Sequence, residues 1–437
     1  MAKLNILELC HDLSLGGIER AMQEFALNID RSRFNVLVAV FDDSGPRKKI
    51  LQDAGVEVVK VTEKSLPGLV RDRKIDVVHS HTIHMKKFIG DTLNIQEVVF
   101  SGGYALDADI NVFISKSLAL KTSTCIDIKY GRDFYVLYYP QNVAAWDRLR
   151  LPQKEISGAR AKLGFGERDF VIGRIGRPEP SKTDYLVLAS AGKIARRIPR
   201  ARFLFVGMPL LFRVFLSLKP SLWGKAVFLK ETPDDAKIAK FYQSIDAFWH
   251  TASWGETFGN VNAEAMVFEK PVVTHSTPFR GGDIEEHMDN AQIEVVDHLK
   301  TGLIASYPED VAKAFEMLSG NSKLVRNLGI QGRRKVLAEY DSRIIVRQFE
   351  RLAQALVLRK RPAILPSSEE VRDYFKKGYK TRLSSSISCP KVMTKARYRM
   401  ARSFHNAVSA IYLIKRYLLR KILGLDLEKF GYRKYDF

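Results

Sequence analysis

The stretch "SIDAFWHTASWGETFGNVNAEAMVFEKPVV", residues 244–273, decides how this chain folds. The apolar run at 247–253 has the length of a buried strand, and a second such run begins at Pro271. Between them, "GNVNAEAMVFE" has the composition of a helix that is entered through a glycine turn. A strand, a helix and a further strand in succession predict a parallel sheet with helices on its faces. Two carboxylates, Glu256 and Glu264, fall in this unit, one in the turn and one in the helix.

The same alternation runs along most of the chain and falls into two series that meet near residue 145. Strands of the first series are expected at 4–9, 34–41, 56–61, 75–81, 97–102, 110–117 and 135–143. Strands of the second are expected at 170–176, 202–207, 226–230, 247–253 and 271–276. We therefore expect an α/β protein with two doubly wound, Rossmann-like domains facing a cleft, at 1–145 and 146–340. A closing helix is expected at 341–360. This helix could either end the second domain or cross back to the first.

Composition limits the class of protein. With 437 residues, 46% of them hydrophobic, the chain is long enough for two packed cores. Cys10, Cys125 and Cys389 are odd in number and far apart, so no disulfide framework is expected and a reducing cytoplasm is the default. Glu8 and His11 interrupt the apolar start, which argues against a signal peptide. No stretch reaches the roughly 18 uncharged apolar residues that a membrane-spanning helix needs.

The net charge of +21 is concentrated in a basic helical C-terminal extension, residues 361–437. This extension holds 18 Lys and Arg against 6 Asp and Glu, a balance of +12. Apolar residues recur at helical spacing between Ile411 and Leu425, among many cations. This pattern favours docking on an anionic membrane surface. Packing on the protein's own body or on a second subunit is the alternative, and nucleic acid is a weaker one because no recognised motif supports it.

Two short loops have the residues to hold phosphates. "IGRPEPSK", residues 175–182, follows a strand and carries Arg177 and Lys182, which suit a diphosphate, although a solvated basic loop would look the same. "SLGGIER", residues 14–20, puts Gly16 and Gly17 between a strand and a helix. Glycines there let backbone N–H groups approach an anion, although a tight turn alone also explains them.

The two glutamates suit ligand binding better than hydrolysis. If 257–264 were helical, Glu256 and Glu264 would be roughly 12 Å apart along the axis. Paired carboxylates of glycoside hydrolases are only about 5–9.5 Å apart. We therefore expect each to hold the hydroxyls at one end of an elongated ligand, with the N–H groups of Thr257, Phe258 and Gly259 facing its phosphates. Two surface glutamates on a helix are the alternative.

Taken together, these motifs resemble a known enzyme family. Residues 244–273 closely resemble the E-x7-E region of family 4 glycosyltransferases of the GT-B fold, and "SLGGIER", "IGRPEPSK" and "FLFVG" (203–207) follow in the family's order. The resemblance covers roughly residues 4–355 and implies a metal-independent, retaining transfer of a sugar from a nucleotide donor, UDP- or GDP-sugar. It implies that Arg177 and Lys182 stabilise the leaving diphosphate. Glu264 would then bind the ribose, Glu256 the donor sugar, and Gly16 and Gly17 would approach the phosphate.

The chain departs from the family in both halves. Gly103 stands where the family often has a histidine, and "GGDIEEHMDNAQIEVV" (281–296) looks inserted. The histidines of "HSHTIH", His79, His81 and His84, invite a zinc interpretation, but no partner set accompanies them in sequence and strand alternation explains two of them. No metal site is therefore expected. His81, at a strand end facing the expected cleft, is kept as a catalytic candidate.

The sequence thus predicts a cytoplasmic glycosyltransferase that acts on a glycan or lipid-linked acceptor in surface polysaccharide or glycoconjugate synthesis. A peripheral position on the cytoplasmic face of the membrane is one option for it. Its rivals are a sugar-nucleotide epimerase, a phosphorylase with lysine-bound pyridoxal phosphate, and a non-catalytic binding protein of the same fold. Against the last stands the joint presence of Arg177, Lys182, Glu256 and Glu264.

Overall fold

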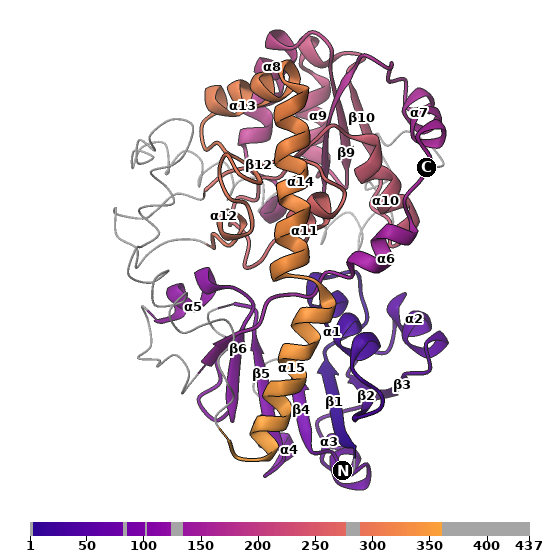
Figure 1. Ribbon diagram of the computed structural model, residues 1–437, viewed down its shortest axis with the longest axis vertical. Helices are drawn as coiled ribbons and strands as arrows, with labels where there is room; N and C mark the ends of the chain where they lie inside the picture. The colour runs from indigo at the N-terminus through magenta and orange to yellow at the C-terminus, as the bar shows by residue number, and fades with distance from the viewer. Residues whose placement is uncertain (1–2, 82–84, 101–102, 124–133, 277–288, 361–437) are drawn as a thin grey trace, which may run out of the picture. The chain divides into compact units, whose positions relative to one another are not determined.

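The computed structural model describes residues 3–81, 85–100, 103–123, 134–276 and 289–360. Within these ranges the chain forms two compact units, shown with their element labels in Figure 1. Unit 1 comprises residues 3–143 and 337–360, and unit 2 comprises residues 144–336. None of the helices in the described ranges has both the length and the apolar character that crossing a membrane requires. The basic extension 361–437 lies outside the described residues.

Unit 1 is built on a seven-stranded sheet in the order β3-β2-β1-β4-β5-β6-β7, in which every pairing is parallel. The strands are β1 (Leu4–Cys10), β2 (Phe34–Val40), β3 (Glu57–Lys60), β4 (Val77–Ser80), β5 (Leu93–Val98), β6 (Ile110–Phe113) and β7 (Phe134–Val136). The helices are α1 (Gly17–Asn28), α2 (Arg47–Asp53), α3 (Leu66–Asp72), α4 (Lys86–Ile89), α5 (Lys116–Ser123) and α15 (Ser342–Val357).

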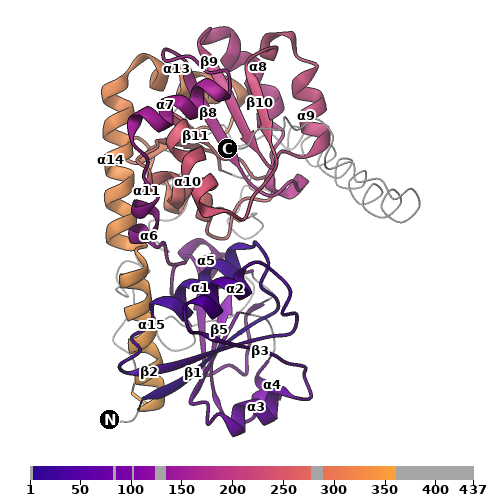
Figure 2. The same ribbon diagram turned by 90° about the vertical axis from the view of Figure 1, so that its right-hand side faces the viewer.

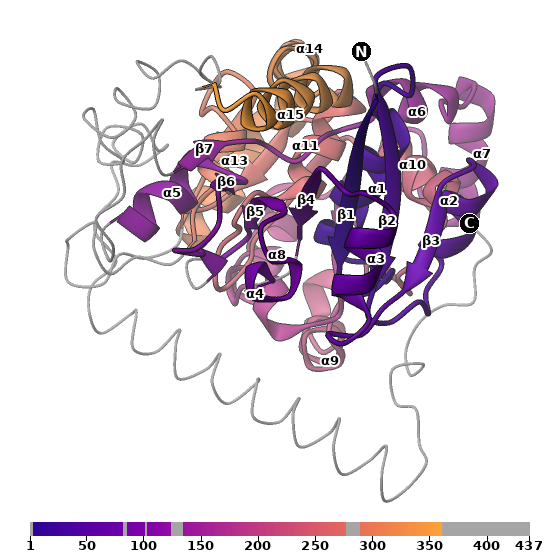
Figure 3. The same ribbon diagram turned by 90° about the horizontal axis from the view of Figure 1, so that it is seen from below.

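The two faces of this sheet are covered by different helices. Alternate residues of the strands, such as Leu7 and Leu9, pack with α3 and with Ile89 of α4. The intervening residues face α1 and α15, where Phe25 packs against Phe349. Figure 3 shows α15 on one face of the sheet and α3 with α4 on the other. Because successive side chains of a strand point to opposite faces of the sheet, unit 1 has one core on each face.

A row of polar side chains crosses the face of this sheet that α1 and α15 cover. Glu8 of β1 is in register with His79 of β4, and its Oε2 lies 2.9 Å from Nδ1 of His79 and 2.7 Å from Nε2 of His81. His81 Nδ1 lies 2.9 Å from Oε2 of Glu97, at the end of β5. The rings of Phe25 and Phe349 pack on His79. The side chains of Glu8, His79 and His81 are fully buried, so each charge among them depends on its neighbours.

Unit 2 has a six-stranded sheet in the order β10-β9-β8-β11-β12-β13, again with parallel pairings only. The strands are β8 (Phe170–Ile175), β9 (Ala201–Val206), β10 (Ala226–Leu229), β11 (Ala247–Trp249), β12 (Val272–Thr274) and β13 (Gly302–Ile304). The α-helices are α6 (Val143–Arg148), α7 (Gln153–Lys162), α8 (Leu186–Arg197), α9 (Leu210–Ser217), α10 (Asp235–Ser244), α11 (Asn260–Val267), α12 (Gln292–Val295), α13 (Pro308–Gly320) and α14 (Ser322–Glu339), and the short 3-10 turns are η2 (Pro180–Lys182) and η3 (Pro220–Leu222).

Helices cover both faces of this second sheet as well (Figure 2). On one face, α8, α9 and α13 bury apolar side chains such as Ile194, Phe212 and Phe315 against β8, β9 and β11. On the other, Phe241 and Ile245, at the end of α10, press on Gly173 of β8. The order of strands and the helices on both sides make each unit doubly wound, as the sequence predicts.

Several predicted boundaries are wrong, each for a local reason. β5 begins at Leu93 rather than at 97. The apolar pattern missed its first residues because Asn94 and Gln96 are polar but buried in the strand. The strand expected over 110–117 ends at Phe113, because the hydroxyl of Ser115 accepts the N–H of Leu118 and starts α5. The short strand β13 was not predicted.

Helix α14 crosses close to the end of α11. Gly329 of α14 lies so near the backbone of Glu269 that a Cβ there would be 2.0 Å from the Glu269 carbonyl oxygen. A Cβ added at Gly332 would likewise lie 3.1 Å from Cγ of Met266. The two glycines let α14 support the helix that carries Glu264.

We expect Gly329→Ala to destabilise unit 2 by about 1–3 kcal/mol, because α14 must move away from α11. Gly158 is the matched control, because it is exposed in α7 and a Cβ added there would have nothing within 4 Å. At that position, Gly→Ala should stabilise by about 0.5–1 kcal/mol through helix propensity. Urea unfolding of the two variants measures both effects. Equal effects of the two substitutions would contradict the close helix crossing.

We also expect the buried row in unit 1 to make stability depend on pH in two windows. Burial alone would lower the pKa of His81, but Glu97 and Glu8 raise it to about 10. Burial alone would raise the pKa of Glu8, but His79 and His81 lower it to about 2. The contribution of His81 to the free energy of unfolding is therefore complete below about pH 6.5 and is lost as the pH rises toward 10. The contribution of Glu8 is complete above about pH 4.5 and is lost as the pH falls toward 2.

The imidazole resonances of the intact protein, followed by NMR between pH 6 and 9, test this directly. His81 should remain protonated throughout, and the His81→Gln variant serves to identify its signal. If the His81 resonance titrated near pH 6.5, the ionised pair with the two carboxylates would be ruled out.

Candidate functional site

The two predicted cations lie on the loop that follows β8 in unit 2. Lys182, at the end of η2, donates from Nζ to Oε2 of Glu256 at 2.8 Å. Arg177 forms an ion pair with Glu179 of the same loop, with 3.2 Å between Nη1 and Oε1. The Arg177 side chain is 56% exposed and that of Lys182 is 29% exposed. Both cations are therefore accessible to an anionic ligand, while Lys182 is also held by a carboxylate.

Glu256 is buried between two side chains that fix its charge. Its Oε2 accepts from Lys182, and its Oε1 lies 3.1 Å from Nε2 of His250. Burial would raise the pKa of the carboxyl, but the charge of Lys182 and the hydrogen bond from His250 hold it well below its usual range. Burial lowers the pKa of His250 despite its carboxylate partner. At neutral pH the group is thus an ionised carboxylate between an ammonium and a neutral imidazole.

Sequence reasoning missed His250, although it lies within an expected strand. β11 ends at Trp249, so His250 is the first residue beyond the strand, at the carboxyl edge where ligands of such sheets bind. A histidine at the end of an apolar strand in the same stretch as Glu256 was the available signal. Its Nδ1 is buried and has no hydrogen-bond partner among the described residues.

Arg174 is a second residue that sequence reasoning missed. It contacts the end of the loop that follows β8. It lies within β8 with no exposed surface and donates from Nη2 to the hydroxyl of Thr183 at 2.6 Å and to the carbonyl oxygen of Lys182. Burial lowers its pKa to about 10, with the charge of Glu256 opposing this. The guanidinium is therefore still charged at neutral pH. An arginine inside an apolar strand pattern was the signal, because buried arginines are rare.

Two further buried titratable groups lie nearby, Asp184 and His275. Asp184 Oδ2 is 4.0 Å from Nε2 of His275. Burial raises the pKa of Asp184 to about 6 and lowers that of His275 to about 3. His275 is therefore neutral at pH 7, and the two groups do not form an ion pair there.

The turn that carries Glu256 ends at Gly259, the glycine through which the sequence predicts entry into the helix. Helix α11 begins at Asn260, because Gly259 adopts a left-handed conformation with φ +94° that breaks the helix before it. Thr257, Phe258 and Gly259 therefore precede the helix, and Gly259 is its N-cap residue. Phe258 also turns its ring into the core, where it is 1% exposed.

Glu264 lies in the second turn of α11 and is 5% exposed. Tyr242 of α10 donates its hydroxyl to Glu264 Oε2 at 2.9 Å. Between Glu256 and Glu264 only the residues from Asn260 onward are helical, so the separation of roughly 12 Å that a continuous helix would give does not apply to this pair. Both glutamates are buried, so the alternative of a surface pair is excluded.

The backbone of Glu256 is fixed from the segment that looked inserted in the sequence. Its N–H donates to Oε1 of Gln292 at 2.9 Å, and its carbonyl oxygen accepts the N–H of Ala291 at 2.8 Å. Gln292 also donates to the carbonyl oxygen of His275. Nothing in the sequence around Gln292 indicated this contact.

The remaining predicted residues belong to unit 1. Gly17 is the first residue of α1 and Gly16 precedes it, as the turn predicted. The space that a side chain at Gly16 would fill is taken by the carboxylate of Glu19. His81 is not open to a ligand, which corrects its prediction as a catalytic residue. Both of its ring nitrogens face carboxylates, and its side chain is 0% exposed.

Among the described residues, one group has donor atoms close enough together to suggest a metal, namely Glu8, His79 and His81, within 4.8 Å of one another. The expectation that the histidines lack partners is therefore wrong. Ligands around a tetrahedral zinc ion are about 3.3 Å apart, given bonds of about 2.0–2.1 Å. Here one Glu8 oxygen lies 2.7 Å and 2.9 Å from the two rings, and Glu97 takes the other nitrogen of His81. These are hydrogen-bond distances, so the group fits shared protons better than a metal.

Comparison with known proteins finds glycosyltransferases similar to this chain. Residues 156–335 match the family model described as glycosyl transferases group 1. The chain is 24% identical over 248 residues to the capsular polysaccharide biosynthesis glycosyltransferase CapM of Staphylococcus aureus, covering 55% of this chain and 60% of CapM. It is 25% identical over 218 residues to the putative glycosyltransferase YtcC of Bacillus subtilis, covering 47% and 50% of the two chains. The chain thus spans little more than half the length of these relatives.

Solved structures match about four fifths of this chain. A glycosyltransferase from Rickettsia africae matches with a TM-score of 0.68 at 14% identity, over 82% of this chain and 99% of that one. Anabaena HepE, solved in complex with UDP and glucose, matches with a TM-score of 0.64 at 18% identity, over 80% and 100% of the two chains. At such identities the likeness shows the fold, which is the predicted GT-B fold. The family match over residues 156–335 lies within unit 2 of this fold.

Proposed function

We propose that this protein is a retaining glycosyltransferase that moves a sugar from a nucleotide-sugar donor to a glycan or lipid-linked acceptor of surface polysaccharide synthesis. The observation that carries the proposal is the chain of contacts Lys182–Glu256–His250, which lies within the matched domain. The link to surface polysaccharide synthesis is supported by the similarity to CapM, whose name places that protein in capsular polysaccharide biosynthesis. The donor, a UDP- or GDP-sugar, is supported by the UDP found in the HepE structure.

In this proposal the cations act on the leaving group. Negative charge develops on the diphosphate as its bond to the sugar breaks, and Arg177 and Lys182 are accessible cations on the loop after β8. Of the two, Lys182 contacts Glu256. Arg174 holds the carbonyl oxygen of Lys182 and so positions the end of the loop. The two cations would provide the charge that a metal ion provides in other transferases, so the reaction needs no metal.

The state of Glu256 determines what it can do. A carboxyl with a pKa well below its usual range has no proton to give at neutral pH, so Glu256 is no general acid. It can accept hydrogen bonds from donor-sugar hydroxyls. Glu264, held by Tyr242, is proposed to accept from the ribose hydroxyls. Gly16, Gly17 and the N–H groups of Thr257, Phe258 and Gly259 remain predictions for the phosphates.

Glu256→Gln should reduce sugar transfer by about a hundredfold or more while UDP affinity changes little, because the side chain acts on the sugar. Glu264→Gln, in contrast, should mainly weaken UDP binding, because this side chain is proposed to bind the ribose. Transfer from a panel of UDP- and GDP-sugars, together with UDP titration calorimetry, measures both. The assays are run with and without EDTA, and EDTA should leave the activity unchanged.

Three results would count against the proposal. Loss of UDP affinity in Glu256→Gln, with correct folding, would remove the sugar-side role of Glu256. Restoration of activity by Mg²⁺ or Mn²⁺ after EDTA would refute the metal-free reaction. Isomerised donor sugar formed without an acceptor would instead identify an epimerase.

We further propose that residues 361–437, which carry +12 of the net charge, bring the protein to an anionic membrane surface. Truncation after residue 360 should release the protein from vesicles that contain phosphatidylglycerol, and added salt should weaken attachment of the full chain. Co-sedimentation with the vesicles measures this. Full-length protein that ignores anionic vesicles at low salt would refute the proposal.

A further inference from the structure

An arginine ridge, defined here as Arg343, Arg347 and Arg351, runs along α15 in unit 1. The three residues are four apart, so they lie on one side of the helix, and all three are exposed. The opposite side, with Ile345, Phe349 and others, is buried against unit 1. Like charges at this spacing destabilise a helix by a few tenths of a kcal/mol per pair. The packed apolar face, and not the surface charges, therefore keeps α15 in place.

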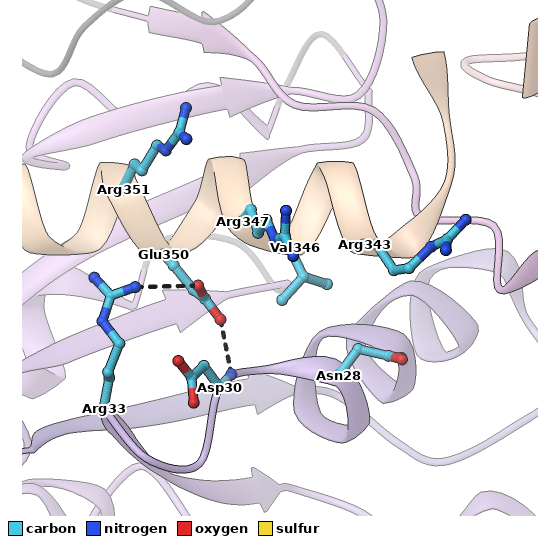
Figure 4. A pocket seen from close by; sticks show the side chains of 8 residues that line it. All are labelled: Asn28, Asp30, Arg33, Arg343, Val346, Arg347, Glu350 and Arg351. Carbon is cyan, nitrogen blue, oxygen red and sulfur yellow. Dashed lines mark hydrogen bonds and ion pairs between the residues drawn. The ribbon is translucent and has the colours of Figure 1, made fainter. Parts of the chain in front are cut away.

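The carboxylates near the ridge are largely engaged by other groups. Asp341 begins the helix, accepts the N–H of Arg343 and binds its guanidinium at 2.9 Å and 3.0 Å. Glu350 accepts the N–H of Asp30 at 2.7 Å and lies 3.9 Å from Nη1 of Arg33. Figure 4 shows Glu350 turned toward Asp30 and Arg33, while Arg351 points away from them.

Asp30 is occupied in the same way. Its Oδ1 accepts from the backbone N–H and the hydroxyl of Ser32, at 2.9 Å and 2.6 Å. These hydrogen bonds lower the pKa of Asp30, so its charge is permanent at neutral pH. Arg347 and Arg351, in contrast, form no ion pair with any acid among the described residues. Two guanidiniums one helical turn apart are thus available to a ligand.

Hollows lie on both sides of the ridge. The one toward Asp30, Arg33 and Glu350, of about 530 Å³, is lined by both signs of charge. The other, of about 410 Å³, has three arginines and no carboxylate in its lining. Its lining residues are Leu337, Arg343, Ile344, Arg347, Gln348 and Arg351. The acid-free hollow is therefore the better place for an anion.

We propose that this acid-free hollow binds a phosphate group, held between Arg347 and Arg351 with Gln348 as a further hydrogen-bond donor. Planar guanidiniums give forked contacts to phosphate oxygens, which makes arginine better suited than lysine to this role. The phosphate belongs either to a soluble compound or to the head group of a lipid, whose glycerol and chain would meet Leu337 and Ile344. The site is separate from the proposed transfer site and does not depend on it.

The test uses full-length protein and the double variant Arg347→Gln/Arg351→Gln. The matched control is Arg326→Gln/Arg334→Gln, which removes the same charge from exposed positions on α14. Inorganic phosphate is titrated against chloride at equal ionic strength, and the unfolding temperature is recorded, since a ligand of the folded state raises it. Arg177→Gln is run in parallel to separate this site from the loop after β8.

Phosphate should raise the unfolding temperature of the wild type, the α14 control and Arg177→Gln, and the double variant should need about tenfold more phosphate for the same rise. An equal response of the double variant would overturn the proposal. If free phosphate does not raise the unfolding temperature, binding of the double variant and of the α14 control to phosphatidylglycerol vesicles is compared. Weaker binding of the double variant than of the α14 control then assigns the site to a lipid phosphate, and equal binding overturns the proposal.

Discussion

The ion pair between Lys182 and Glu256 is the contact on which the candidate functional site of unit 2 depends. It joins the loop after β8 to the turn before α11, and these loops come from neighbouring parts of the sheet because β11 pairs with β8. Removing one partner of a largely buried pair leaves the other charge uncompensated, at a cost of about 3–5 kcal/mol where burial is complete. Arg174, His250 and Gln292 all bond to one side of this pair or the other. The chain thus holds an ionised carboxylate and an accessible ammonium together before any ligand binds.

Unit 1 shows that buried charges at the carboxyl edge of a sheet need not form a ligand site. Glu8, His79, His81 and Glu97 also lie on neighbouring parallel strands, yet their contacts are to one another and the histidine side chains have no exposed surface. In unit 2, by contrast, Arg177 and Lys182 keep part of their surface open. Exposure of the charged side chains, rather than the presence of charge, therefore distinguishes the candidate functional site from a structural cluster.

The sequence was sufficient for the fold class because strand and helix periods are properties of single segments, and nearly every strand of the two sheets follows from an apolar run. It was insufficient where polar residues are buried, as at Asn94 in β5, and where a contact joins distant segments. Lys182 and Glu256 were recognised through spacing and family resemblance. Their direct contact was not predicted, and neither was the support from Gln292, 36 residues beyond Glu256. His81 was misjudged because its position at a strand end indicates nothing about the two carboxylates that surround it.

The central claim is that the cations after β8 hold a nucleotide diphosphate while Glu256 faces the donor sugar. A crystal structure of the full chain with a bound, non-hydrolysable UDP-sugar or GDP-sugar analogue tests it most directly. The account expects the diphosphate to contact Lys182 and Arg177, and a sugar hydroxyl to donate to Glu256. A bound nucleotide whose phosphates lie away from both cations, with Lys182 and Glu256 still paired and untouched, would contradict the account.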